Sequence, residues 1–166
     1  MAERQLKIMA ATLEGHPLLE EIDSYTAPNV EFATTESRGG RFATRNLIVG
    51  LNAMEASIAL NGADSALYAD LSPVDGQEIE LYVRRAMRTE SGGAVAVKDW
   101  VTGTVRQVEE KESKMGELPQ RTVHLDVVAF KRTEDGKTIY DIDVKTQKID
   151  LGQGDIMAKF RQAAEI

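Results

Sequence analysis

Cysteine is absent from the 166 residues of this chain. This excludes disulfide bridges and thiolate metal sites, and it fits a protein that assembles in a reducing compartment. Aromatic residues make up only 5% of the chain, which argues against an aromatic platform for stacking bases. No apolar run is long enough to cross a bilayer, and residues 1–10 carry scattered charges where a secretory signal would have an apolar core. We therefore expect no membrane partner.

The charge balance is acidic. Asp and Glu number 27 against 20 Lys and Arg, so the formal net charge is −7. Such a chain is not built to grip nucleic-acid phosphates, although it could let nucleic acid pass without adhesion. The length suits a single domain, residues 1–166, that buries a core without metal or disulfide support.

Alternation of apolar and polar residues with a period of two dominates the chain and predicts strands. In residues 78–84, Ile79, Leu81 and Val83 share one face. Asp135-Gly136 separates two alternating runs, a strong hairpin signal. The expected strands cover residues 6–13, 29–35, 52–60, 78–84, 94–108, 123–130 and 138–144. The run from 123 places Val123, Leu125, Val127 and Ala129 together, and Gly103 predicts a bend or bulge in the long strand 94–108.

Helix is sparse in this pattern. Asp64 is positioned to cap a short helix over residues 65–71, and Asp155 to cap a second over residues 156–164. The second is too short to be stable alone, so it must dock on its own subunit or on a neighbour. Residues 35–46 and 109–120 are expected to be loops. The predicted fold is mainly β, an antiparallel β-sandwich or barrel with one or two short α-helices.

The residues offer no catalytic constellation. His124 and Asp126 share a strand face, but two groups without a third ligand complete neither a metal site nor a triad. A strand histidine hydrogen-bonded to a neighbour is the favoured interpretation. Asp141 and Asp143 also share a face, and we favour an acidic strip or an interface over a hydrolytic pair. We expect no enzyme activity, no cofactor and no metal.

The order and spacing of several segments resemble the major tail tube protein of contractile-tailed bacteriophages and of R-type bacteriocins. The resemblance extends from about Leu13 to the C-terminus and is clearest in the C-terminal third. The segments that carry it are Ala27–Val30, Glu36–Gly40, Gly50–Ala56, Val105–Glu109, Tyr140–Asp143 and Gly154-Asp155.

The resemblance implies a structural subunit of the virion tail. Members of the family close into hexameric rings that stack into a hollow tube, the conduit for genome ejection. The implied partners are further copies of the chain, a tail sheath protein, a baseplate or tube initiator, a tape-measure protein, and viral DNA passing through the lumen without sequence-specific binding. Assembly is expected in the host cytoplasm. We expect the subunit interfaces to include Arg38, Gly39, Gly40, Glu109, Glu110, Lys111, Asp141, Asp143 and Phe160.

Two other functions stay open at this level. One is the tube of a phage-derived bacteriocin or contractile injection device, whose subunit would look alike in sequence. The other is a monomeric β-barrel that binds a small ligand or peptide in one concave pocket.

Overall fold

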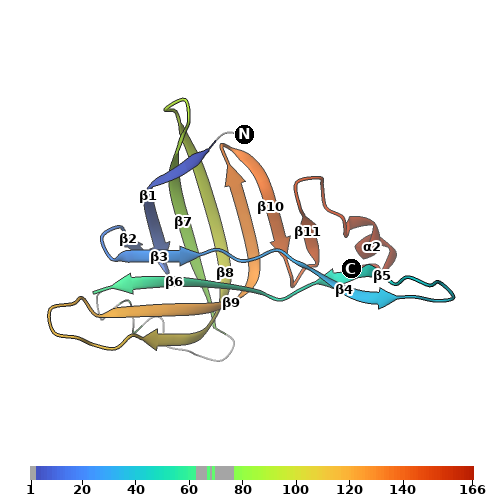
Figure 1. Ribbon diagram of the computed structural model, residues 1–166, viewed down its shortest axis with the longest axis horizontal. Coiled ribbons are helices and arrows are strands. Elements are labelled where there is room, and N and C mark those ends of the chain that lie inside the picture. The colour runs from blue at the N-terminus through green and yellow to red at the C-terminus, as the bar shows by residue number, and fades with distance from the viewer. Residues whose placement is uncertain (1–2, 63–66, 68, 70–76) are drawn as a thin grey trace.

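The computed structural model describes residues 3–62, 67, 69 and 77–166. The regular structure of these residues is almost entirely antiparallel strand, and helix α2 lies near the C-terminus (Figure 1). The elements are β1 (Arg4–Leu13), β2 (His16–Leu18), β3 (Ile22–Thr26), β4 (Phe32–Ser37), β5 (Arg45–Leu51), β6 (Met54–Asn61), β7 (Glu78–Thr89), β8 (Ala94–Glu110), β9 (Gln120–Glu134), β10 (Lys137–Asp143), β11 (Lys148–Asp150) and α2 (Ala158–Ala163). The predicted mainly antiparallel β fold is confirmed. Most of the helix predicted over residues 65–71 lies outside the described residues.

Strand β9 organises the sheet because it has different neighbours along its two halves. One edge pairs with β8 along nearly its whole length, and the other pairs first with β6 and then with β10. The main sheet follows the order β11-β10-β9-β8-β7-β1-β2. Strands β3 and β6, with the first half of β9 that pairs with β6, form a branch from this sheet. The branch crosses the main sheet at a steep angle, so the two enclose a core between them (Figure 1).

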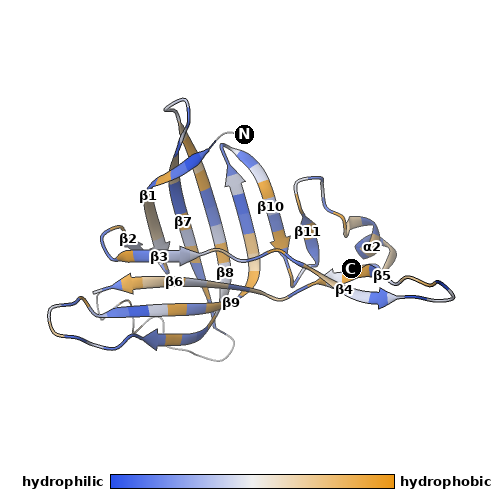
Figure 2. Ribbon diagram, viewed as in Figure 1, coloured by the Kyte–Doolittle hydropathy of each residue, from blue (hydrophilic) through white to orange (hydrophobic). Residues whose placement is uncertain are grey.

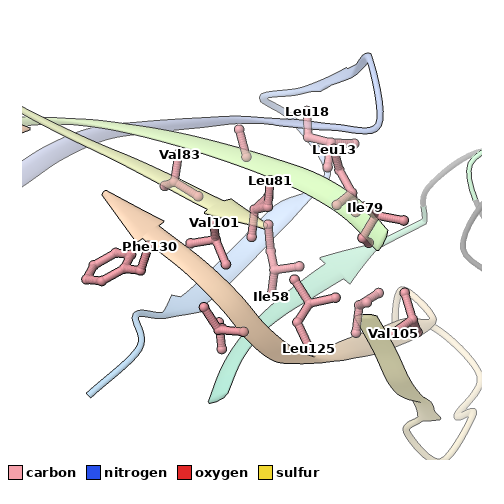
Figure 3. Packing of buried hydrophobic residues seen from close by; sticks show 14 of the residues in the cluster. Leu13, Leu18, Ile58, Ile79, Leu81, Val83, Val101, Val105, Leu125 and Phe130 are labelled. Atoms are coloured by element: carbon pink, nitrogen blue, oxygen red, sulfur yellow. The ribbon is translucent and has the colours of Figure 1, made fainter. Parts of the chain in front are cut away.

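The core forms where the alternating apolar faces meet. Ile79, Leu81 and Val83 are buried as predicted, and they pack with Ile58 and Leu125 from the branch (Figure 3). Burying a side chain of this size contributes roughly 1.5–3 kcal/mol, so the alternating pattern is itself the main source of stability.

A β-bulge lies in the long strands at the place where Gly103 predicted one. Thr102 pairs with Ala129 and Gly103 with Val127, so Val128 is an extra residue in β9. The insertion reverses the alternation, and Phe130 takes the buried position that was predicted for Ala129. The grouping of Ala129 with the core face was therefore wrong.

The tightest turn matches its sequence signal. Asp135 and Gly136 both have positive φ, and Glu134 pairs directly with Lys137 across them. Two central residues with positive φ are typical of a type I′ hairpin turn, which favours Asp-Gly.

The two predicted loops are shorter than expected. Strands β4 and β5 reduce the first to residues 38–44, and the extension of β8 through Glu110 reduces the second to residues 111–119. Strand β5 was missed because Leu47, Ile48 and Val49 form a consecutive apolar run without alternation.

Candidate functional site

The polar groups that could have formed a reactive site are paired with one another. The His124 Nε2 atom lies 3.0 Å from a carboxylate oxygen of Glu109 on the neighbouring strand. This confirms the hydrogen-bonded strand histidine. Among the described residues, no group of three or more His, Cys, Asp and Glu side chains is placed to hold a metal ion. The described part of the chain also contains no helix of the length and apolarity that a bilayer span requires.

The one fully buried charge found among the described residues is Asp99, with 0% exposure. Arg132 donates to it twice, from Nε at 2.8 Å and from Nη2 at 3.0 Å. Arg85 Nη2 donates at 2.9 Å, and the hydroxyl of Tyr25 donates at 3.0 Å. The four side chains come from β8, β9, β7 and β3, so the cluster connects the branch to the main sheet.

Burial and the Asp99 carboxylate set the protonation states in this cluster. Burial raises the pKa of Tyr25, and the neighbouring negative charge of Asp99 raises it further. Burial alone would lower the pKa of Arg132, but hydrogen bonding and attraction to Asp99 outweigh it and raise that pKa. The raised pKa values keep Tyr25 a neutral phenol and Arg132 a guanidinium, so both act as hydrogen-bond donors to Asp99 in a structural connection between strands.

Sequence reasoning missed this cluster, although a signal for it was present. Asp99 shares one face of β8 with Val97 and Val101, which are both buried. Arg85 shares the inward face of β7 with Val83. A charge that interrupts an apolar face at the strand period indicates a buried ion pair.

The most unusual surface belongs to the hairpin of β4 and β5, which projects from one end of the molecule (Figure 1). Ile48 and Val49 of β5 are each 64% exposed, and they lie at a bulge: Ala33 pairs with Gly50 and Thr34 with Ile48, so Val49 is an extra residue. Figure 2 shows hydrophobic colour on β5 away from the main core. Because a two-stranded hairpin is marginal by itself, one that leaves neighbouring apolar side chains uncovered needs a partner.

The tip of this hairpin is basic and carries an exposed aromatic ring. Phe42 is 97% exposed. The turn from Arg38 to Arg41 is closed by a hydrogen bond from the Arg41 N–H to the Arg38 carbonyl, and Gly39 has a positive φ of 56°. The side chains of Arg38 and Arg41 donate only to backbone oxygens of the tip. No described carboxylate forms an ion pair with either of them.

An apolar cleft of about 470 Å³ lies where the root of the hairpin meets the C-terminal segment. The residues that line it are Val49, Gly50, Leu51, Asn52, Ala53, Met54, Ile142, Val144, Gln147, Ile149 and Met157. The turn beside the cleft is ordered by Asp143, whose Oδ1 accepts the N–H groups of Lys145 and Thr146.

Helix α2 completes this end of the molecule without a buried residue of its own. Phe160 is 55% exposed, so its apolar stripe is not covered within the chain. The helix begins at Ala158 and not at Ile156, and its N-cap is Met157, without a side-chain cap hydrogen bond, so the predicted cap by Asp155 was wrong. Asp155 accepts hydrogen bonds from the N–H groups of Ile149 and Met157 and from Arg161, and these lower its pKa to about 2.

The structure separates the predicted interface residues into three places. The first place is the hairpin tip, which contains Arg38, Gly39 and Gly40. The second is the C-terminal segment, which contains Asp141, Asp143 and Phe160. There, Asp141 accepts a hydrogen bond from Lys148 Nζ at 2.9 Å. Glu109, Glu110 and Lys111 lie at the opposite end of the molecule (Figure 1), where Glu110 pairs with Arg121. The first two of those three belong to β8 and not to a loop. Sequence reasoning missed Phe42 and the cleft.

The comparisons with known proteins agree on one architecture. The chain resembles a chain of the sheath/tube terminator of an extracellular contractile injection system, PVC, in its extended state, with a TM-score of 0.59 at 7% identity, covering 76% of this chain and 93% of the other. A chain of the PVC sheath-tube complex gives 0.57 at 8% identity, with coverage of 76% and 88%. The SPP1 tail tube gives 0.51 at 11% identity, with 76% of each chain covered. At these identities the likeness establishes the fold.

No curated protein sequence matches the chain. A family model does, and it decides the identity: the model of phage tail tube protein FII matches residues 3–164, nearly the whole chain. The chain therefore belongs to the phage tail tube protein FII family and is a structural subunit of a tail tube.

Proposed function

We propose that copies of this chain close into hexameric rings, and that the rings stack into the hollow inner tube of a contractile tail. The observation that carries the proposal is the β4–β5 hairpin, whose apolar residues Ile48 and Val49 are uncovered in a single copy. A self-assembling subunit resolves this by burying the hairpin against a neighbour.

The edges of the sheet support closure into a ring. Among the described residues, β2 pairs only with β1 and β3 pairs only with β6. Exposed strand edges promote uncontrolled association unless they are covered or joined to another chain. A closed ring in which neighbouring sheets join removes such edges.

We further propose that the tube is enclosed by a sheath protein, begins on a baseplate or tube initiator, and is limited in length by a tape-measure protein. In a virion the lumen would carry DNA during ejection, and assembly would take place in the host cytoplasm. The net charge of −7 suits a conduit that repels phosphates and has no enzymatic role. A genome-free injection device would need the same subunit.

Negative-stain microscopy of the purified chain tests this proposal. Rings or tubes of uniform width are expected, and light scattering should show assemblies whose abundance rises with protein concentration. A species that stays strictly monomeric at high concentration would refute the proposal.

A further inference from the structure

The exposed ring of Phe42 at the hairpin tip and the apolar C-terminal cleft cannot meet within one chain. Phe42 lies eight residues before Gly50, which lines the cleft at the root of the hairpin. At about 3.3 Å per strand residue, the ring lies roughly 20–25 Å from its own cleft. The pairing of β4 with β5 keeps the hairpin extended, from Phe32 opposite Leu51 to Ser37 opposite Arg45.

We propose that Phe42 of one copy enters the C-terminal cleft of the next copy, an inference that rests on the proposed self-assembly. The cleft, at about 470 Å³, is large enough for a phenylalanine side chain, and Ile142, Val144 and Ile149 give it an apolar lining. The knob and the hole occupy different places on the same chain, so the contact is head-to-tail. Such contacts generate rings or filaments and not closed dimers.

The charges of the two surfaces favour this pairing. Residues 38–45 contain three arginines and no carboxylate, a charge of +3. Residues 141–157, which supply five of the cleft residues, contain four aspartates and two lysines, a charge of −2. Complementary charge of this kind steers partners together and fixes their orientation.

Two of those aspartates are available to an incoming guanidinium. Asp141 is already paired with Lys148, and Asp155 with Arg161. Asp143 and Asp150 accept hydrogen bonds only from backbone N–H groups. Neither forms an ion pair with a cation among the described residues, so arginines of the neighbouring tip would complete their coordination.

Engineered cysteines test the contact directly, because the natural chain has none. The full-length double variant Phe42→Cys, Val144→Cys is assembled and then oxidised. A ladder of covalent multimers on a non-reducing gel is expected. The matched control is Phe42→Cys with Met115→Cys, since Met115 is fully exposed on the loop after β8 at the other end of the molecule (Figure 1). No ladder is expected from the control.

The outcomes separate this inference from the proposed function. Rings or tubes that form normally but yield no ladder from the Phe42–Val144 pair would overturn the contact and leave the tube intact. Cross-linking of the single variant Phe42→Cys to itself would indicate a symmetric tip-to-tip contact and overturn the head-to-tail arrangement. A wild-type chain that never assembles would instead refute the proposed function.

A second measurement covers the case in which the cysteines prevent assembly. Phe42→Ala should raise the protein concentration needed for assembly at least tenfold, and Phe42→Leu should restore much of the loss. Val144→Trp, which fills the cleft, should have the same effect as Phe42→Ala. The Met115→Ala control should assemble like wild type. Unchanged assembly of both Phe42→Ala and Val144→Trp would contradict the inference.

Discussion

Two single residues, Asp99 and Gly103, are expected to contribute strongly to the stability of this subunit. Asp99 does so through its buried carboxylate. Replacing Asp99 by Ala would leave Arg85 and Arg132 without their shared acceptor in a nearly buried site. Removing one partner of a buried ion pair costs roughly 3–5 kcal/mol, so we expect a loss of that size in the free energy of unfolding.

Urea denaturation followed by circular dichroism measures this loss. The control is Asp126→Ala, because Asp126 is exposed on the outer face of β9 and lies 3.8 Å from Arg106 at its nearest contact. Exposed substitutions of this kind usually change stability by less than about 0.5 kcal/mol. Equal effects of the two substitutions would show that the Asp99 cluster contributes no special stability.

Gly103 is the second such residue, for steric reasons. A Cβ atom added there would lie 2.4 Å from the carbonyl oxygen of Asp126 and 3.2 Å from the Cα of Val127. Both neighbours are backbone, so β9 would have to move and the bulge would be disturbed. We expect Gly103→Ala to lower the free energy of unfolding by roughly 1–3 kcal/mol.

The matched control for Gly103→Ala is Gly50→Ala. Gly50 also belongs to a strand, but an added Cβ would meet nothing within 4 Å. Thermal melting should separate the two variants by several degrees, as expected for such a difference in a domain of this size. A Gly103→Ala variant as stable as Gly50→Ala would be inconsistent with the close approach.

At the scale of elements, what the sequence could predict depends on how each element is stabilised. Strands β7 and β10 alternate because one face is buried, so their existence was evident from residues such as Ile79 and Ile142. Strand β5 could not be recognised by alternation, since Ile48 and Val49 are both exposed in one copy. The consecutive apolar residues of β5 reflect partners outside the chain. Hydrophobic periodicity in a sequence indicates only those strand faces that the chain itself covers.

The C-terminal segment gives a prediction on pH at this scale. Hydrogen bonds from Arg161, Ile149 and Met157 lower the pKa of Asp155 from 3.8 to about 2. A carboxyl with a lowered folded-state pKa stabilises the folded segment above the unfolded value, and this contribution is lost as the pH falls. We therefore expect the docking of α2 to weaken as the pH is lowered from about 4 to about 2.

Amide hydrogen exchange of residues 149–163, followed across this pH range, measures the effect. The variant Asp155→Asn cannot ionise, so its exchange should already be faster at neutral pH, and correction for the intrinsic exchange rate should leave it nearly independent of pH. Protection in the wild-type segment that stays constant down to pH 2 would contradict the assigned role of Asp155.

At the scale of the whole molecule, the assembly determines which surfaces of a subunit contact its neighbours. The interface residues predicted from sequence fall at both ends of the subunit, and no chain can bring its own hairpin tip to its own cleft. Sequence resemblance indicated that such contacts exist, but it could not identify Phe42, because an exposed aromatic residue in a loop has no periodic signal. The contact depends on geometry between copies.

The net charge of the whole subunit determines how strongly a tube of such subunits would bind DNA. With a charge of −7 per subunit, a tube gains little from the counterion release that drives proteins onto duplex DNA. We expect wild-type tubes not to retain a short duplex at physiological salt in a co-sedimentation assay. Each of the two outward sheet faces carries acidic residues, Glu80 and Asp141 on the main sheet and Glu55 and Asp126 on the branch.

Reversing these charges one face at a time identifies the lumen. The variant Glu80→Lys, Asp141→Lys and the variant Glu55→Lys, Asp126→Lys each replace two negative charges by two positive ones, which changes the net charge from −7 to −3. DNA bound at the outer surface is removed by nuclease, whereas DNA inside the tube is protected. We expect one variant alone to retain nuclease-resistant DNA, because only one face lines the lumen. Nuclease-resistant DNA in wild-type tubes would argue against a conduit that repels its cargo.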